Sequence, residues 1–416
     1  KFYTIFCVVK KKNIINLSLI LFSVMISLYI VEIFIKIYHD NTIDCLTNRE
    51  LKEKRSIRFG YNYDKRFIYE YVQDLKLRTT YGNAPTALIT KIKKNKINLP
   101  FLPLSSYSNE RIYLCNETGE HSSYTSDRYG FNNPDVVWKK NSTDLLLLGD
   151  SFVAGSCINK TNENNFGDIF RNKSFNIVNL GLAGHGPLLE YATFIEYGKF
   201  LKPKKVLWFY YEGNDFDGLN VEKESIILKS YLNDKSYDLK SKQKKIDNLL
   251  YKNEYSLNDL EEYEKNKIQK NIRFCNLTFQ KTRQLIGFKE LKNLIFRVNT
   301  NLKKEKSFNE ENFLIFEEII LKTKKEIDKW NGELVFIYLP KYSRYKEVFV
   351  NHDDYDNKKR ILNLVNKNGI KTIDIHKGFF QTKKDPLKFF PLRKSGHYNK
   401  EGVKRISQFI FDNIYK

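Results

Sequence analysis

The chain has 416 residues, of which 41% are hydrophobic and 15% aromatic, and its 71 lysines and arginines against 49 acidic residues give a formal net charge of +22. This length allows one large domain with insertions or two domains, and the apolar content excludes wholesale disorder. The lysines are spread along the whole chain and no nucleic-acid-binding motif accompanies them, so we expect no nucleic-acid partner.

A long apolar run near the N-terminus predicts a membrane anchor. Residues 14–35 contain a single charged side chain, Glu32, and lysines occupy positions 10–12. About 20 apolar residues cross a bilayer, and lysines before a span favour a cytoplasmic N-terminus. We therefore expect a cytoplasmic segment over residues 1–13, a single transmembrane helix over 14–37, and the rest of the chain outside the cytoplasm. A cleaved signal peptide and a buried core helix are the alternatives.

The next stretch, residues 38–140, is charged and weakly periodic, and we treat it as a linker and lead-in. Within it, two short runs on either side of a turn at Asn116–Gly119 predict a β-hairpin. Five cysteines are scattered without the spacing or the histidine clusters of a zinc site, so no metal is expected. Cys115 and Cys157 flank the strand at residues 145–148 and can pair in an oxidising compartment; two free thiols are the alternative.

From residue 141 onward, short apolar runs alternate with helical patterns. The runs expected to be strands are Leu145–Leu148, Phe175–Asn179, Val206–Tyr211, Leu334–Tyr338 and Thr372–Ile375. The patterns expected to be helices are Asn165–Arg171, Leu188–Phe200, 310–331, 357–368 and Glu401–Tyr415. This alternation predicts a three-layer α/β/α sandwich over residues 141–416, around a parallel, flavodoxin-like sheet of about five strands. Residues 221–308, rich in Lys and Glu, interrupt it as a helical insertion, which is either a solvated surface element or a lid.

The first of these strands ends in Gly149, Asp150 and Ser151. In open parallel sheets, ligands bind in the crevice at the carboxyl ends of the strands, so a serine there is well placed for a nucleophile. All three residue types also favour turns, and a plain strand-ending turn is the competing interpretation.

Three later stretches add polar groups to the same rim. The second strand is followed by Gly181 and Gly184, whose backbone N–H groups can approach a ligand closely. The third strand is followed by Asn214, whose side-chain amide can donate hydrogen bonds. His397 lies in a loop just before the last helix, where an imidazole can act as a general base. Turn formation, helix capping or simple exposure explains each stretch singly, but the ordered set predicts one catalytic site.

Four residues on this rim follow one another in the order Ser151, Gly184, Asn214 and His397. This order resembles the sequence blocks of the SGNH (GDSL-like) hydrolase family, including its membrane-anchored bacterial members. The resemblance covers roughly residues 144–220 and 333–416. It implies that Ser151 attacks an ester carbonyl and that His397 takes the serine proton. It also implies an oxyanion hole made by the N–H groups of Ser151 and Gly184 and the Asn214 amide, with Gly181 as the alternative middle donor.

The chain departs from the family at the acid that orients the histidine. Members commonly carry an aspartate two or three residues before the histidine, where this chain has Ser395 and Lys394. One possibility is a Ser–His dyad, with Ser395 or a backbone carbonyl orienting the imidazole. The other is a carboxylate from elsewhere, for which Asp385 is the nearest candidate in sequence.

The resemblance implies an extracytoplasmic, membrane-anchored serine esterase that hydrolyses acyl esters, acetyl esters in particular, on a carbohydrate or another polar substrate. The same serine can instead carry an acyl group onto an envelope polysaccharide. A third interpretation is a binding protein that keeps the fold with weakened catalysis, motivated by the missing aspartate. No metal or organic cofactor is expected, and the expected partners are an acyl-ester substrate and the lipid bilayer.

Overall fold

A computed structural model describes residues 19–20, 22–31, 48–95, 99–158, 165–272, 309–346, 357–394 and 396–415. The chain divides into two compact units, and the larger one comprises residues 52–265 and 309–416. Half of the expected membrane span over residues 14–37 lies outside the described residues; residues 19–20 and 22–31 are helical. None of the described helices is both long and apolar enough to span a bilayer. The elements discussed below belong to the larger unit.

The core of this unit is a parallel five-stranded sheet. Its strands are β3 (Leu145–Leu148), β4 (Ile177–Asn179), β5 (Lys205–Tyr211), β6 (Glu333–Leu339) and β7 (Lys371–Asp374). The order is β4-β3-β5-β6-β7, and every neighbouring pair is parallel. The chain passes from β3 to one neighbour, β4, and then returns to the other neighbour, β5. This is the flavodoxin-like order expected from the sequence, and it opens a crevice at the carboxyl end of β3.

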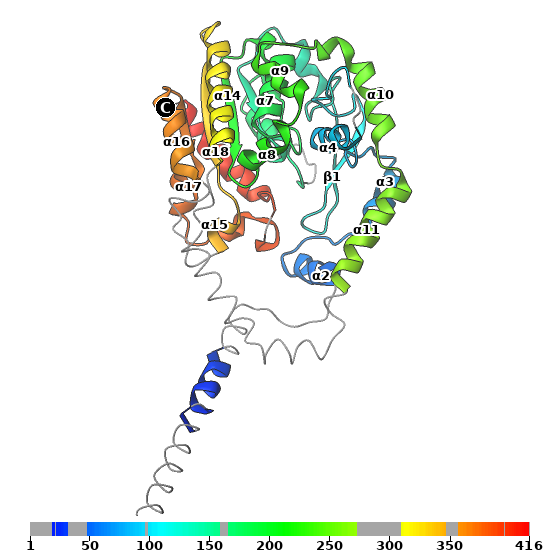
Figure 1. Cartoon of the computed structure of the whole chain (residues 1–416), viewed down its shortest axis with the longest axis vertical. Helices are drawn as coiled ribbons and strands as arrows, with labels where there is room; N and C mark the ends of the chain where they lie inside the picture. The colour runs from blue at the N-terminus through cyan, green and yellow to red at the C-terminus, as the bar shows by residue number, and fades with distance from the viewer. Residues whose placement is uncertain are drawn as a thin grey trace, which may run out of the picture. The chain divides into compact units, whose positions relative to one another are not determined.

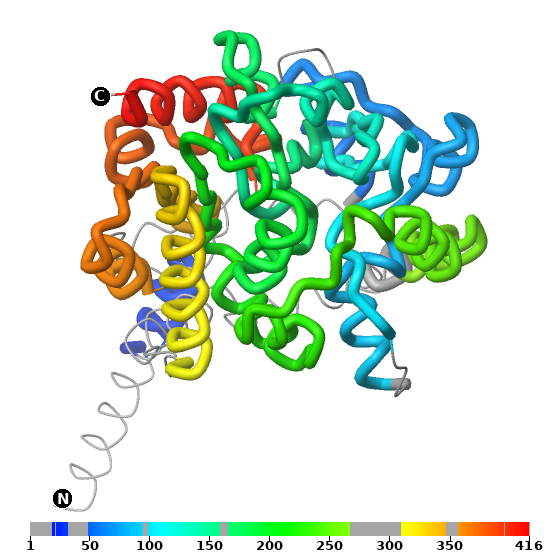
Figure 2. Tube along the Cα trace, turned by 90° about the horizontal axis from the view of Figure 1, so that it is seen from above, coloured from blue at the N-terminus to red at the C-terminus, as the bar shows by residue number. Residues whose placement is uncertain are grey.

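Helices cover both faces of the sheet, because the side chains of β5 alternate between the two faces and residues 206–210 are all buried. Leu207 and Phe209 share a core cluster with residues of α6 (Phe166–Arg171) and α18 (Lys400–Ile414). Trp208 and Tyr210 point to the opposite face, toward helices α7 and α14. The indole of Trp208 donates to Glu190 of α7 (Pro187–Thr193), and the Tyr210 ring lies 5.5 Å from that of Phe316 in α14 (Glu310–Asp328). The expected three layers are therefore present, and α14 lies beside α16 (Lys358–Lys367) in Figure 1 and Figure 2.

Asparagine side chains set the start of three helices that the periodicity predicts. Asn165 accepts from the third residue of its helix α6, Asn309 does the same for α14, and Asn399 for α18. Such caps satisfy N–H groups that a helix leaves unpaired at its first turn. The expected helix at Leu188–Phe200 forms as α7, a π-helical turn over Phe194–Gly198 and a 3₁₀ turn over Lys199–Leu201.

The segment expected to be a linker is instead folded into the larger unit. It forms α2 (Asn48–Arg58), α3 (Ile68–Leu75), α4 (Pro85–Asn95) and the antiparallel hairpin of β1 (Arg111–Cys115) and β2 (Ser122–Thr125). A small cluster joins Val72, Leu77 and Tyr113 to Leu260 of the insertion. The apolar side chains of this segment thus pack against one another and against the insertion. The expected domain boundary at residue 140 stays a prediction.

The described part of the insertion is helical, as expected. It contains α8 (Asp215–Glu222), which extends just into it, α9 (Ile226–Leu232), α10 (Gln243–Asn253) and α11 (Leu257–Ile272). Leu228, Ile246 and Leu260 are at most 1% exposed, so these helices pack against the rest of the unit. Residues 273–308 lie outside the described residues, and whether the insertion acts as a lid stays open. The smaller elements of the unit are α5 (Ser151–Ala154), α15 (Ser343–Lys346), α17 (Ile375–Gly378) and several 3₁₀ turns.

A buried ion pair beside the catalytic rim offers a test of the fold. Glu212, at the end of β5, accepts hydrogen bonds from Tyr338 and from Arg344 of α15, and the Glu212 and Arg344 side chains are both fully buried. Glu212→Ala leaves the Arg344 charge without its carboxylate, which costs about 3–5 kcal/mol. We expect this loss in the free energy of unfolding, measured by urea titration.

The exposed pair of Arg360 and Glu310 provides the matched control for that substitution. Glu310→Ala should cost no more than about 1 kcal/mol, because water screens exposed pairs. An equal loss in the two variants would contradict the role given to burial.

Candidate functional site

The serine of the Gly-Asp-Ser sequence begins helix α5 directly after β3. Asp150 caps this helix: its Oδ1 atom accepts the N–H of Phe152 at 2.9 Å. Ser151 is therefore the first helical residue, and a first-turn N–H has no partner within its own helix. The strand end and the short helix together place Ser151 Oγ at the carboxyl rim of the sheet.

His397 meets this serine from the loop before α18. Its Nε2 atom lies 2.7 Å from Ser151 Oγ. The ring also packs against Phe152, with the two ring centroids 4.8 Å apart. The next residue anchors the loop, because the Tyr398 hydroxyl donates to the Pro340 carbonyl at 2.6 Å. The nucleophile and the base expected from the sequence are therefore in direct hydrogen-bond contact.

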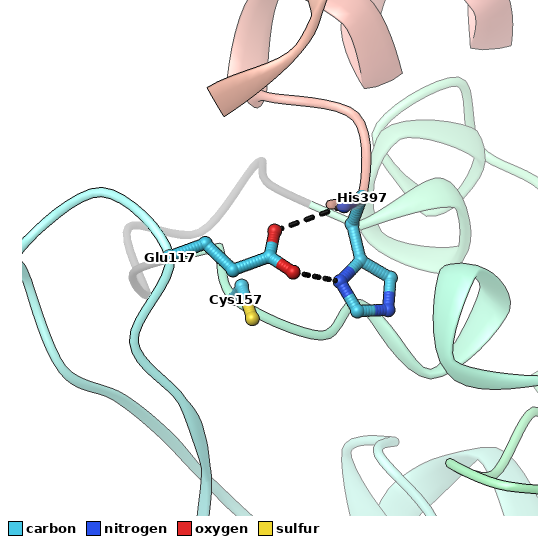
Figure 3. A group of neighbouring side chains, drawn as sticks. All are labelled: Glu117, Cys157 and His397. Carbon is cyan, nitrogen blue, oxygen red and sulfur yellow. Dashed lines mark hydrogen bonds and ion pairs between the residues drawn. The ribbon is translucent and has the colours of Figure 1, made fainter. Parts of the chain in front are cut away.

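A carboxylate that the sequence analysis did not find completes the arrangement. Glu117, in the turn of the β1–β2 hairpin, places Oε1 2.9 Å from His397 Nδ1. Its Oε2 atom accepts the backbone N–H of His397, also at 2.9 Å. Figure 3 shows both contacts. Glu117, His397 and Ser151 thus have the geometry of the acid, base and nucleophile of a serine-hydrolase triad.

Of the two candidates expected for the orienting group, the described residues include only Asp385, and it has another partner. Asp385 forms an ion pair with Arg393, at 2.6 Å, on the surface. Ser395 lies outside the described residues. The dyad interpretation is therefore corrected: a carboxylate reaches the imidazole, and it comes from a segment that precedes the nucleophile in the chain.

The backbone around Glu117 explains why the carboxylate fits there. Gly396 has φ of +132°, and a Cβ atom on it would lie 2.5–2.8 Å from the Glu117 carboxyl group. Only glycine tolerates both that dihedral and that close approach. On the hairpin side, the Asn116 side chain accepts the N–H of Gly119 at 2.9 Å, and Lys52 of α2 donates to Asn116 at 2.7 Å. Helix α2 therefore supports the turn that carries the acid.

The surroundings of His397 raise its pKa above the ordinary value. Burial lowers this pKa, but the hydrogen bond that His397 donates to Glu117, the Glu117 charge and the Asp150 charge together outweigh that effect. The carboxylate contact also indicates that Nδ1 carries a proton, which leaves Nε2 free to accept the serine proton. The Glu117 carboxylate thus favours the protonated form of the His397 imidazole.

The predicted oxyanion donors differ in their availability. The Gly181 N–H donates to the Asn179 side chain at 2.8 Å, so it is already engaged. Gly184 is exposed with φ of +80°, and its N–H has no acceptor among the residues that the structure describes. Asn214 is exposed at the start of α8, where its side chain hydrogen-bonds the Asp150 carboxyl group. This geometry favours Gly184 over Gly181 as the middle donor.

A buried carboxyl group holds the loop that carries Gly184. Glu222 of α8 accepts the N–H of Gly186 at 2.6 Å and that of Leu188 at 2.9 Å. Burial raises the pKa of Glu222 to about 7, against the opposing effect of these hydrogen bonds. Burial and repulsion between acids also raise the pKa values of Glu190 and Asp215 well above their usual range. Protonated forms are therefore favoured behind the site, which limits the negative charge there.

A disulfide lies beside the triad. Cys115 and Cys157 are bonded, with their Cα atoms 5.0 Å apart, so the paired alternative is the one found. One ligand-type atom from each of Glu117, Cys157 and His397 lies within 4.8 Å of the others. The disulfide sulfur is not a thiolate, however, and thiolate is the form of cysteine that binds metals. The cluster therefore fits a triad better than a metal centre.

Comparisons with known proteins find no matching family model and no matching curated protein. Among solved structures, the chain is similar to a protein from Desulfitobacterium hafniense that is described as lipolytic and of the G-D-S-L family. The TM-score is 0.33 and the identity 12%, over 65% of this chain and 98% of that one. A second crystal structure matches with a TM-score of 0.32 and 11% identity, over 66% and 97%. At these values neither similarity supports a functional inference, which has to come from the site.

The triad geometry predicts that Glu117 matters for turnover and that Asp385 does not. In Glu117→Gln the imidazole loses its charged partner, and replacing the acid of a protease triad costs about 10⁴-fold. We expect a fall of about 10²–10⁴-fold in kcat for ester hydrolysis, with KM little changed. Asp385→Asn, which removes the nearest carboxylate that precedes His397 in sequence, should retain wild-type kcat; a matching loss there would contradict the assignment.

Proposed function

We propose that this protein is a serine esterase of the SGNH type, with Ser151 as nucleophile, His397 as general base and Glu117 as the acid that orients the base. One observation carries the proposal: the imidazole of His397 is hydrogen-bonded to Ser151 at one nitrogen and to Glu117 at the other. That is the arrangement by which a weakly nucleophilic hydroxyl is activated.

The proposed reaction proceeds in two halves. Ser151 Oγ attacks the ester carbonyl as its proton passes to His397 Nε2, and the N–H groups of Ser151 and Gly184 with the Asn214 amide stabilise the oxyanion. His397 then protonates the leaving alcohol, which departs and leaves an acyl group on Ser151. In the second half, His397 takes a proton from water, the resulting hydroxide attacks the acyl carbon, and the carboxylic acid is released as Ser151 regains its proton.

We further propose that the substrate is an acyl ester, with acetyl expected, on a carbohydrate or another polar molecule. The substrate class comes from the resemblance to membrane-anchored SGNH hydrolases, since a fold does not determine it. We also propose a single membrane span over residues 14–37, with the catalytic domain outside the cytoplasm. The Cys115–Cys157 disulfide supports this location, because disulfides persist mainly in oxidising compartments.

Two alternatives share the site and differ in outcome. Transfer of the acyl group to an envelope polysaccharide would use the same acyl-enzyme, with a sugar hydroxyl in place of water. A binding protein with weakened catalysis was suggested by the missing aspartate two or three residues before His397, and the Glu117 carboxylate contacts the imidazole in its place. The esterase is therefore the better supported of the three.

A fluorophosphonate probe tests the nucleophile directly. We expect the probe to label Ser151 in the folded full-length protein and turnover of p-nitrophenyl acetate to be lost in Ser151→Ala. Turnover of the ester unchanged by that substitution would rule out the esterase and the transferase alike. Two polysaccharides separate hydrolysis from transfer. An esterase releases acetate from an acetylated polysaccharide, whereas a transferase moves the radioactive acetyl group of a donor onto a non-acetylated polysaccharide.

The pH dependence provides a second test. A general base must be neutral to act, so kcat/KM should rise with pH as His397 loses its proton. Because the pKa of His397 is raised, the midpoint of this rise should lie above the pKa of an ordinary histidine, about 6.5. In Glu117→Gln the opposing charge is gone and burial continues to lower the pKa. The midpoint should therefore move to lower pH as the plateau falls. A midpoint that is unchanged in this variant would contradict the pairing of Glu117 with His397.

A further inference from the structure

The disulfide joins the two segments that carry the acid and the nucleophile. Cys115 is the last residue of β1 and stands two positions before Glu117. Cys157 follows the helix α5 that Ser151 begins. The bond spans 42 positions, and its Cys157 sulfur lies within 4.8 Å of ligand atoms of Glu117 and His397. Figure 3 draws these three side chains together. The covalent link is therefore made at the active site itself.

The hairpin is a small structure that the backbone of Arg78 and Asp64 contacts from the preceding chain. Its strands β1 and β2 form a two-stranded sheet separate from the main one, with an irregular register between Tyr113 and Cys115. A two-stranded hairpin is marginally stable by itself in water. Helix α2 supports the far side of the turn, where Ser56 donates to the Thr118 carbonyl and Lys52 to Asn116. On the side that faces Ser151, the disulfide connects Cys115, two positions before Glu117, to Cys157.

We propose that the Cys115–Cys157 disulfide is a positioning element that holds the Glu117 carboxylate against His397, so that the base is fully supported only while the disulfide is intact. The inference rests on the proposed function for its catalytic consequence, but the contact that it concerns is structural. A displacement of about 1 Å from productive geometry can cost about 10²-fold in rate. Release of one end of a turn of this kind permits a displacement of that size.

Breaking the bond is a defined chemical step. A dithiol such as dithiothreitol supplies two electrons and two protons, the S–S bond becomes two thiols, and the dithiol becomes a cyclic disulfide. Neither Ser151 nor His397 is altered in this reaction. Loss of activity on reduction would then reflect the position of Glu117, provided that the fold persists.

A cycle of four full-length proteins tests whether the disulfide acts through Glu117: wild type, Cys115→Ser/Cys157→Ser, Glu117→Gln and the triple variant. We expect the double serine variant to lose about tenfold or more in kcat with KM within about twofold. The triple variant should equal Glu117→Gln within about twofold, because the disulfide has nothing left to position. Equal losses in the two backgrounds would overturn the proposal, as would wild-type kcat in the double variant.

A second measurement is independent of esterase activity. The pKa of His397, followed by NMR in protein with labelled histidine and assigned by its absence in His397→Asn, should fall in the double serine variant as it does in Glu117→Gln. A pKa unchanged from wild type would show that Glu117 keeps its place without the disulfide. Failure of the proposed function looks different: turnover would be independent of Ser151, while the His397 pKa would still report on the disulfide.

Two controls separate positioning from a loss of fold. Near-ultraviolet circular dichroism of the double variant should match wild type, and reoxidation of dithiothreitol-treated wild type should restore kcat. Ser56→Ala, which removes a hydrogen bond on the opposite side of the same turn, measures how much α2 contributes. If Ser56→Ala reproduced the whole loss and the double serine variant none of it, the positioning role would belong to α2 and the proposal would fail.

Discussion

The paired hydrogen bonds between Glu117 and His397 are the interaction on which the rest of the site depends. One carboxylate oxygen binds the ring nitrogen and the other binds the backbone N–H of the same residue, so both the orientation of the imidazole and the path of its loop are set together. Gly396 leaves the space that this requires. The hairpin is therefore part of the active site, although it lies outside the five-stranded sheet that carries the nucleophile.

The main sheet and most of its helices could be predicted because their signals are local. The leucine run at Leu145–Leu148 and the apolar runs of β5 and β6 indicate strands buried on both faces, and each lies where it was expected. Ser151 and His397 could be paired for a related reason. In a parallel sheet, residues that follow different strands meet at one rim, so the order of elements is enough to bring them together.

Glu117 could not be found in this way, because its position depends on tertiary contacts of a turn with no regular relation to the sheet. The family pattern directs attention to residues just before the histidine, where this chain has Lys394 and Ser395. The one useful signal was Cys115, since pairing with Cys157 brings the turn close to the serine. The helices of residues 48–95 were missed for a similar reason: Val72 of α3 lies in a cluster with Leu260 of the insertion, and periodicity within a short segment does not reveal a distant partner.

The three members of the triad are far apart along the chain, and this has a consequence for when activity appears during folding. Ser151 and His397 are separated by 246 positions, and Glu117 and His397 by 280. Contacts between such distant positions form late, because closing long loops costs entropy before the contacts repay it. A partly folded chain would hold Ser151 without its base, and its hydroxyl would be as unreactive as that of any surface serine. The nucleophile is thus silent until the sheet is complete, and covalent labelling of Ser151 would report the native state rather than a collapsed intermediate.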